Sequence, residues 1–209
     1  MMPGPSNPHR ETRRKSRENR DRLLQVAFRE MHSKGFQGLR VDDVLKRAGL
    51  TKGAFYHYFS SKRELGLAVV EEVIATMMKQ LWLEPLAAAE DPLAVISSAL
   101  TRKTDIFGPD FLTLGCPLNN LAQEMSPVDE GFRERLEHIF SDWKSLIAGS
   151  LQRAQKNGTV RADIDADEAA VFIVAALEGC ISLAKTARDP QALAAGERQL
   201  NRYLDTLRA

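Results

Sequence analysis

The sequence predicts an all-α protein of about nine helices, and three observations agree on this fold class. Apolar residues recur at helical spacing in every strongly patterned segment, no segment alternates apolar and polar residues as a half-buried strand does, and no hairpin turn signal is found. The chain has 209 residues, 44% of them hydrophobic, which is enough to bury one large core or two modest ones. We therefore expect a folded helical protein.

Charge divides the chain into a basic first third and an acidic remainder. The 29 Lys and Arg residues nearly balance the 28 Asp and Glu residues over the whole chain. Residues 1–66, however, carry a net charge of +8, and residues 67–209 carry a net charge of −7. A positive field confined to one part of a chain is typical of a segment that contacts a polyanion.

Residues 1–17 are expected to form a flexible basic arm, because they combine three prolines with closely spaced arginines and lack apolar periodicity. A first helix is predicted from Glu18 onward, where apolar residues at positions i, i+3, i+4 and i+7 between Leu24 and Met31 form one face. This helix is expected to end at Gly35, since glycine readily adopts the left-handed cap conformation.

Two short helices and one long helix are predicted next. The sequence favours a helix over Asp42–Ala48, stopped by Gly49, and another over Thr51–Phe59, with the Thr51 side chain as its cap. The long helix begins directly afterwards and is expected to end at Pro85, because proline lacks the backbone N–H that a continuing helix needs.

Beyond Pro85 every strong pattern is again helical. The predicted helix from Asp165 to about Lys185 is apolar almost all round and therefore needs cover on two sides. The last predicted helix, Ala192–Leu207, has one apolar face. We expect these two helices to pack against those of a second copy, which makes the protein a homodimer.

The cytoplasm is the expected location. The most apolar run, Ala169–Leu177, is shorter than the roughly 20 residues that cross a bilayer, so no membrane contact is expected. Met1–His9 lacks the apolar stretch of an export signal. The two cysteines, Cys116 and Cys180, are too few for a disulfide scaffold of this size.

The segment from Val41 to Phe59 has the mechanics of a helix-turn-helix. Gly49 permits a tight turn, and Leu50 and Phe55 fill the angle between the two helices. A short helix of this kind can enter the major groove of B-DNA. The residues that its outer face presents are Lys52, Gly53, Ala54, Tyr56 and His57.

On these residues the sequence resembles the TetR/AcrR family of bacterial transcriptional regulators. The likeness runs from Arg22 to about Val69, and the combined spacing of its motifs is highly specific. One departure is Leu45, where many members have Ala. The segments that carry the resemblance are Lys34-Gly35-Phe36, Val41-Asp42-Asp43-Val44, Ala48-Gly49-Leu50-Thr51-Lys52-Gly53, Tyr56-His57-Tyr58-Phe59 and Ser61-Lys62.

The resemblance implies an architecture and a set of DNA contacts. Residues 18–66 are the expected helix-turn-helix DNA-binding domain, and residues 67–209 are the expected helical domain for ligand binding and dimerisation. Gly53 and Ala54 are expected close to base edges. The residues expected on phosphates are Thr51, Lys52, Tyr56, His57 and Lys62.

An effector-binding cavity is the second site that the resemblance implies. The residues that we expect to line it are Phe107, Leu118, Trp143 and Phe172. Each of these apolar side chains has an alternative role as an ordinary core residue. The effector is expected to be a small molecule of unknown identity.

A narrower resemblance covers Gly115–Met125, where a Gly-Cys, Asn-Leu and Glu pattern is similar to a TetR subgroup. Some members of that subgroup sense reactive electrophiles or small unsaturated molecules. Pro117 favours the first position of a helix, which places Cys116 at the N-cap, where the helix dipole stabilises a thiolate. Cys116 is therefore a candidate reactive thiol, and the alternative is a small buried apolar side chain.

The sequence thus predicts a homodimeric, sequence-specific transcriptional regulator, a repressor that a small-molecule effector releases from its double-stranded DNA operator. The alternative is an all-helical ligand- or protein-interaction dimer that binds nucleic acid only nonspecifically. No enzyme, cofactor or metal site is expected, since the four histidines are scattered and no nucleophile motif, phosphate loop or zinc-ligand spacing is present. The acidic pair Asp129-Glu130 is interpreted as a solvated helix start.

Overall fold

The computed structural model of the protein describes residues 8–87, 89–98 and 110–209. These described residues form helices and no strand, which confirms the predicted all-α class with about nine helices. The chain divides into two compact units, Met1–Val73 and Ile74–Ala209. This division and the domain boundary expected after residue 66 both fall within one continuous helical segment.

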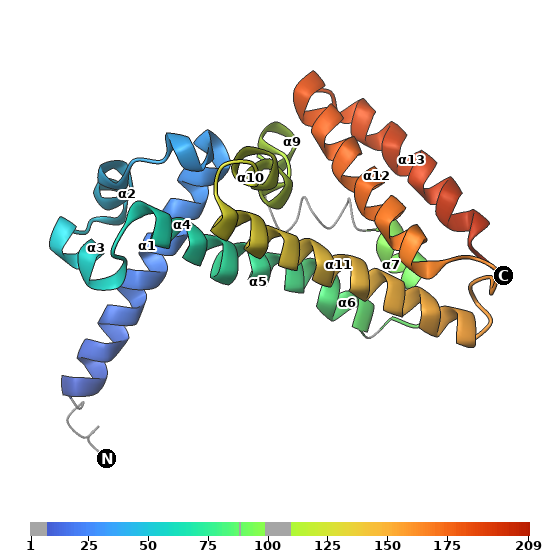
Figure 1. Cartoon of the computed structure of the whole chain (residues 1–209), viewed down its shortest axis with the longest axis horizontal. Coiled ribbons are helices and arrows are strands. Elements are labelled where there is room, and N and C mark those ends of the chain that lie inside the picture. Colours follow the sequence, from blue (N-terminus) through green and yellow to red (C-terminus); the bar gives the residue numbers. More distant parts are fainter. Residues whose placement is uncertain (1–7, 88, 99–109) are drawn as a thin grey trace, which may run out of the picture. The chain divides into compact units, whose positions relative to one another are not determined.

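Unit 1 contains three helices followed by the start of that long segment (Figure 1). Its core is made by apolar side chains such as Val44, Phe55 and Leu65. Gly35 has a φ of 75°, which is not helical, so α1 is kinked at the residue where the first helix was predicted to end. The elements are α1 (Pro8–Gly38), α2 (Val41–Ala48), α3 (Lys52–Tyr58), α4 (Lys62–Ala68) and the π-helical η1 (Val69–Ile74).

Residues 8–17 belong to α1, so the prediction of a flexible arm is wrong over this stretch. Ser16 Oγ lies 3.1 Å from the hydroxyl of Tyr58, and Arg14 pairs with Glu18 one turn along at 3.5 Å. The first helical residue is a proline, whose missing N–H has no partner at that position anyway. These contacts are polar, and apolar periodicity therefore could not reveal them.

The caps at the end of α2 and the start of α3 lie at the predicted residues, and a serine caps α4. Gly49 ends α2 with a φ of 65°, a left-handed conformation that other residues adopt only with strain. At the start of α3, Thr51 Oγ1 accepts a hydrogen bond of 3.2 Å from the backbone N–H of Ala54. Ser61 Oγ accepts a similar bond of 3.1 Å from Glu64 at the start of α4. Such caps matter here, because helices this short are marginal on their own.

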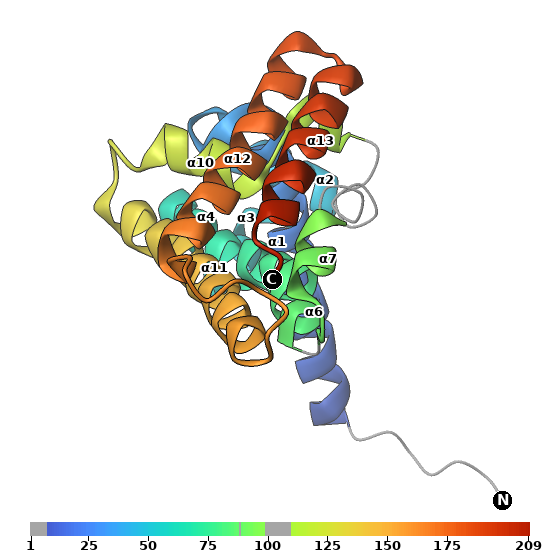
Figure 2. The same ribbon diagram turned by 90° about the vertical axis from the view of Figure 1, so that its right-hand side faces the viewer.

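Unit 2 contains α11 and the paired helices α12 and α13, which lie side by side in both views (Figures 1 and 2). The pair is so close that a Cβ on Gly196 of α13 would stand 2.1 Å from Cys180 Sγ of α12. Only glycine therefore fits at that crossing. The elements are α5 (Ala75–Met78), the π-helical η2 (Lys79–Leu83), α6 (Glu84–Ala87), α7 (Pro92–Ser97), α9 (Phe111–Leu114), α10 (Pro117–Met125), α11 (Glu130–Lys156), α12 (Ala166–Ala187) and α13 (Pro190–Thr206).

The prediction that the long helix ends at Pro85 is wrong, because helical residues continue to Ala87. The π-helical element η2 stands directly before α6, and within it the backbone N–H of Glu84 donates to the carbonyl of Lys79. A π turn already replaces the regular i to i−4 hydrogen bonds of the helix at this point. The N–H that proline lacks therefore removes fewer helical hydrogen bonds here than it would in an unbroken α-helix. Apolar spacing does not distinguish such a turn from ordinary α-helix.

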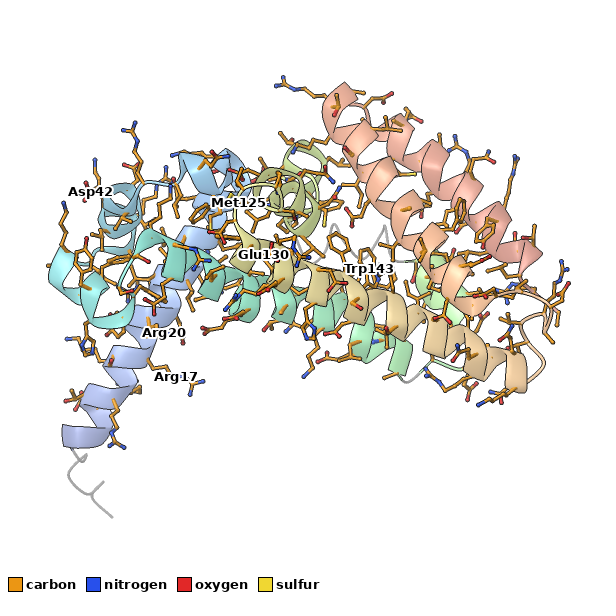
Figure 3. All side chains as sticks on the ribbon, in the orientation of Figure 1. Arg17, Arg20, Asp42, Met125, Glu130 and Trp143 are labelled. Carbon is orange, nitrogen blue, oxygen red and sulfur yellow. The ribbon has the colours of Figure 1, made fainter. Side chains whose placement is uncertain are left out.

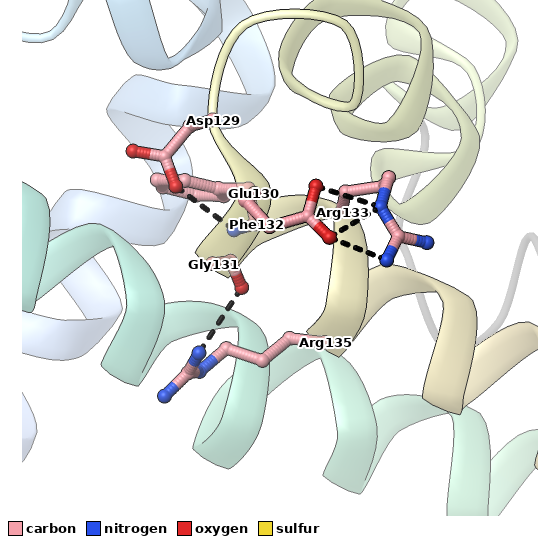
Figure 4. A network of polar contacts seen from close by, with 6 residues as sticks. All are labelled: Asp129, Glu130, Gly131, Phe132, Arg133 and Arg135. Carbon is pink, nitrogen blue, oxygen red and sulfur yellow. Dashed lines mark hydrogen bonds and ion pairs between the residues drawn. The ribbon is translucent and has the colours of Figure 1, made fainter.

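The acidic pair at the start of α11 has a structural role (Figure 4). Asp129 is the N-cap, and its Oδ1 accepts a hydrogen bond of 3.1 Å from the backbone N–H of Phe132. Glu130 accepts three hydrogen bonds of 2.6 to 3.0 Å from the guanidinium of Arg133, which lower the pKa of Glu130. The interpretation of this pair as a solvated helix start is therefore confirmed.

One helix of the described residues, α12, is long and apolar enough to cross a membrane by length and composition alone. Here α11 and α13 pack against it, and 44% of its most apolar stretch is buried. The residues left exposed include an apolar row with a spacing of four, which we call the α12 stripe: Val171, Ala175, Gly179 and Leu183. A row of this kind needs a further surface to cover it.

Candidate nucleic-acid interface

The turn between α2 and α3 is fixed by its backbone and by apolar side chains on both sides. The N–H of Leu50 donates to the carbonyl of Leu45 at 3.1 Å, which closes the turn around Gly49. Leu45 and Phe55 are both buried, so the core accommodates leucine at position 45, where the sequence departs from the expected pattern. The inner side of α3 is thereby held in the core, and its other side faces solvent.

The exposed side of α3 carries the side chains that the sequence predicts to contact DNA. Tyr56 is 64% exposed, a high value for so large an aromatic side chain. Lys52 and His57 are exposed as well, and Ala54 is half-buried. This face therefore offers a cation, hydrogen-bonding groups and a flat aromatic ring to a partner.

Gly53 lies on this same face without a structural need for glycine. A Cβ at this position would meet only Thr51 Oγ1, at 3.9 Å, within the fold. Glycine in a helix costs about 0.5–1 kcal/mol relative to Ala, so its use here calls for a reason outside the fold. Close approach of another molecule to the backbone supplies such a reason.

Two lysines near α3 have partners within unit 1. Lys52 Nζ pairs with Asp42 Oδ1 at 3.1 Å, and both side chains are exposed. Exposed pairs of this type contribute about 1 kcal/mol or less, so the ammonium can move to a phosphate at little cost. Lys62 Nζ donates to the carbonyl of Gln37 at 3.1 Å and lies 4.8 Å from the ring of Phe36.

Arg20 connects three elements of unit 1 and was not singled out from the sequence. Its Nη1 and Nη2 donate to Glu72 Oε2 (2.6 Å) and Oε1 (2.5 Å) on η1, and its guanidinium lies 5.2 Å from the ring of Phe59. The hydrogen bonds from Arg20 lower the pKa of Glu72. The sequence feature that could have identified Arg20 is its position, because it lies one turn before the buried Leu23 on the same face of α1.

Replacing Glu72 by Gln is expected to lower the free energy of unfolding at neutral pH by about 1 kcal/mol or less, because the pair is partly exposed. The stabilisation is present above the ordinary carboxyl pKa of about 4.3 and is lost as the pH falls through the lowered pKa of folded Glu72. Urea unfolding of both proteins in neutral and in strongly acidic buffer measures this. An equal difference in both buffers would contradict a charge-based contact.

A buried carboxylate holds α2 against α1. Glu30 is buried, and its two oxygens pair with Lys34 Nζ at 2.8 Å and Arg47 Nη1 at 3.0 Å. Because removing the partners of a buried charge is costly, this cluster fixes how α2 sits on α1. The position of α3 depends on it, since α3 follows α2 through a tight turn.

Unit 2 contains a groove between α5 and η2 on one side and α11 on the other. Its volume is about 510 Å³, within the range of small-molecule sites. Trp82 and Trp143, which are 1% and 3% exposed, form part of its wall, with ring centroids 4.8 Å apart, and Figure 3 places Trp143 on α11. Lys79 and Asp142 add opposite charges. The other lining residues are Ala75, Met78, Leu83, Ile139, Ser145 and Leu146.

Of the four residues predicted to line an effector cavity, the three that the structure describes do not form one cluster. Trp143 lines the groove, whereas Leu118 is fully buried in α10 and is not among the groove residues. Phe172 lies on α12, with its ring 4.5 Å from that of Tyr203. Phe107 lies outside the described residues. Periodicity identifies the residues that share one face of one helix, but it does not show which faces of different helices meet.

Cys116 is the N-cap of α10, followed by a proline, as the sequence predicts. Its side chain is only 3% exposed, which matches the alternative of a small buried apolar residue. Beside it, Asn120 Nδ2 donates to the carbonyl of Leu114 at 2.6 Å, and Lys185 Nζ donates to Asn120 Oδ1 at 3.0 Å. These bonds tie the turn before α10 to α12.

The helical fold and the exposed face of α3 define a class, the helix-turn-helix DNA-binding proteins that carry a second helical unit. Residues 23–69 match the family described as bacterial regulatory proteins, tetR family. Residues 93–200 match the family described as tetracyclin repressor-like, C-terminal domain. The chain belongs to the TetR family and is a DNA-binding transcriptional regulator.

Individual relatives agree with this assignment over most of the chain. The transcriptional regulator AcuR of Cereibacter sphaeroides is 30% identical over 187 residues, which cover 88% of this chain and 84% of AcuR. The HTH-type transcriptional repressor DhaR of Mycobacterium sp. (strain GP1) is 25% identical over 181 residues, which cover 83% of this chain and 86% of DhaR. A TetR transcriptional regulator from Chloroflexus aurantiacus has a crystal structure with a TM-score of 0.81 and 27% identity, covering 93% of this chain and 98% of its own. The family resemblance seen in the sequence is therefore confirmed.

Proposed function

We propose that the protein is a homodimeric repressor that binds an inverted-repeat operator through α3 and leaves it when a small apolar molecule occupies the groove of unit 2. The observation that carries the DNA-binding part is the exposed face of α3, on which Tyr56 is 64% exposed, Lys52 makes only an exposed ion pair, and Gly53 meets no structural need for glycine within the fold. A dimer with two such faces matches the twofold symmetry of an inverted repeat.

Each residue on this face has a proposed role. Gly53 and Ala54 approach base edges, because neither has a side chain that would hold α3 away from the groove floor. Thr51 Oγ1 accepts from the backbone of α3, which leaves its hydroxyl proton to donate to a phosphate. The other residues proposed to contact phosphates are Lys52, Tyr56, His57 and Lys62.

Selection from random duplexes is expected to enrich an inverted repeat with half-sites about 34 Å apart. Lys52→Ala is expected to weaken binding to every duplex by roughly tenfold, since a phosphate contact carries no sequence information. Ala54→Ser is expected to change the preferred bases instead. Lys144→Ala, a charge removal in unit 2, is the control. Enrichment of no sequence would favour the alternative, an interaction dimer with nonspecific binding.

The α12 stripe is the surface proposed for dimerisation. It is apolar, exposed in the single chain and located on a helix whose other faces pack against α11 and α13. Two copies that pair through this stripe and α13 cover it mutually, since a twofold interface uses the same patch on both subunits. The dimer is required for tight operator binding, because one α3 contacts only a half-site.

The groove between η2 and α11 is the proposed effector site. Two indole rings and several aliphatic side chains favour a small, flat and largely apolar molecule, and Lys79 and Asp142 can orient a polar group on it. A ligand lowers operator affinity only if it binds the DNA-free conformation better than the DNA-bound one. The π turn η2 forms part of the groove wall, and such turns are often found at functional sites.

A further inference from the structure

We propose that the first turns of α1, residues 11–17, are a second DNA-contacting element that binds backbone phosphates flanking the sequence read by α3. We call this stretch the basic extension. The inference rests on the proposed operator binding and adds a surface that lies outside the helix-turn-helix. Its partner is the same duplex, engaged through charge and not through bases.

The basic extension is fixed beside the carboxyl end of α3. Ser16 and Arg20 lie on the same side of α1 as the buried Leu23. These two polar side chains therefore face the rest of unit 1. Ser16 Oγ contacts the hydroxyl of Tyr58, the last residue of α3, and Arg20 lies over the ring of Phe59, which follows it. Figure 1 shows the first turns of α1 extending past α2 and α3. The outward side chains therefore have a defined position next to the proposed DNA-binding face.

The outward side chains of the basic extension are almost all cationic. Arg13, Arg14, Lys15 and Arg17 are exposed, and Glu11 is the one acidic residue of the stretch, so its net charge is +3. Figure 3 shows Arg17 on this part of α1, one turn before Arg20. Arg13 and Arg17 stand four residues apart, a spacing at which like charges repel and destabilise a helix. A polyanion alongside the helix removes that cost.

The chemistry of the stretch favours a nucleic acid over a lipid surface. Residues 11–17 contain no apolar side chain, whereas a helix that lies on a membrane needs an apolar face to insert. Seven helical residues span about 10 Å, which is the length of about three base pairs along the duplex axis. The basic extension is therefore suited to a few phosphates at each end of the operator.

The test compares Arg13→Gln/Arg17→Gln with the unmodified protein on two duplexes, one trimmed to the selected inverted repeat and one with ten further base pairs on each side. Gln preserves helix propensity and removes both charges. On the longer duplex, the slope of log affinity against log salt is expected to become less steep by up to about 3.6, which is 0.9 for each of four arginines in the dimer. On the trimmed duplex the two proteins are expected to bind alike.

Lys144→Gln/Lys156→Gln on α11 is the matched control, because it removes two charges far along the sequence from α1. An unchanged slope on the longer duplex would overturn the proposal. Equal losses of affinity on both duplexes would place the contacts inside the repeat and overturn the assignment to flanking phosphates. An equal change of slope in the control variant would show that only the overall charge of the protein matters, and this would also overturn the proposal. If the unmodified protein preferred no sequence, the proposed operator binding would fail first, and the inference with it.

Discussion

Replacing Val171 by Glu is expected to convert the dimer into monomers and to weaken operator binding by about 100-fold or more. Val171 is 54% exposed in the single chain, so the new carboxylate does not disturb the fold of a protomer. At the proposed interface the same carboxylate is buried in the apolar surface that the second copy covers, where an unpaired charge costs several kcal/mol. Loss of the second half-site then removes an avidity of about 10²–10⁴. Sedimentation and operator titration measure the two effects.

Val128→Glu is the matched control for this experiment. Val128 is 62% exposed and lies in the turn after α10, so the substitution adds the same charge to the same kind of exposed residue outside the α12 stripe. Leu183→Glu, at the far end of the stripe, is expected to repeat the result. If both stripe variants remained dimeric and folded, the interface would lie elsewhere on unit 2.

The helix-turn-helix was predictable because its determinants are local. The turn requires a left-handed conformation at position 49, which glycine adopts without strain, and Thr51 accepts a hydrogen bond from a backbone N–H three residues away. The exposed face of α3 follows from the spacing around Phe55, since one buried residue fixes which side of a short helix faces solvent. Short-range geometry of this kind is contained in the order of residues along the chain.

The parts that the sequence did not predict depend on contacts between distant residues. The helical structure of residues 8–17 is supported by a hydrogen bond between Ser16 and Tyr58, and the position of Arg20 depends on Glu72, 52 residues further along. Trp82 and Trp143 meet only because the long helical segment and α11 pack together. Their sequence patterns indicate two apolar faces without indicating that these faces enclose a groove.

The proposed effector groove has a built-in optical probe, because Trp82 and Trp143 are the two tryptophans of the chain and both line it. A molecule that enters the groove is therefore expected to change nearly all of the intrinsic tryptophan emission. The anionic dye 8-anilinonaphthalene-1-sulfonate is apolar and aromatic, carries a charge that Lys79 can pair with, and accepts energy from tryptophan. We expect it to bind with a decrease in tryptophan emission and a rise in its own. Small aromatic compounds that displace the dye are expected to weaken operator binding.

Ala75→Phe is expected to reduce dye affinity by at least about tenfold, which is 1.4 kcal/mol, because the added ring occupies the groove from the α5 side. Operator binding is expected to remain, since Ala75 lies outside unit 1 and outside the α12 stripe. The same variant is expected to lose its response to any compound that displaces the dye from the unmodified protein. Ala162→Phe, in the exposed turn before α12, controls for the added ring. If Ala75→Phe still released the operator in response to those compounds, the effector would bind elsewhere in unit 2, and the indole pair would be ordinary core packing.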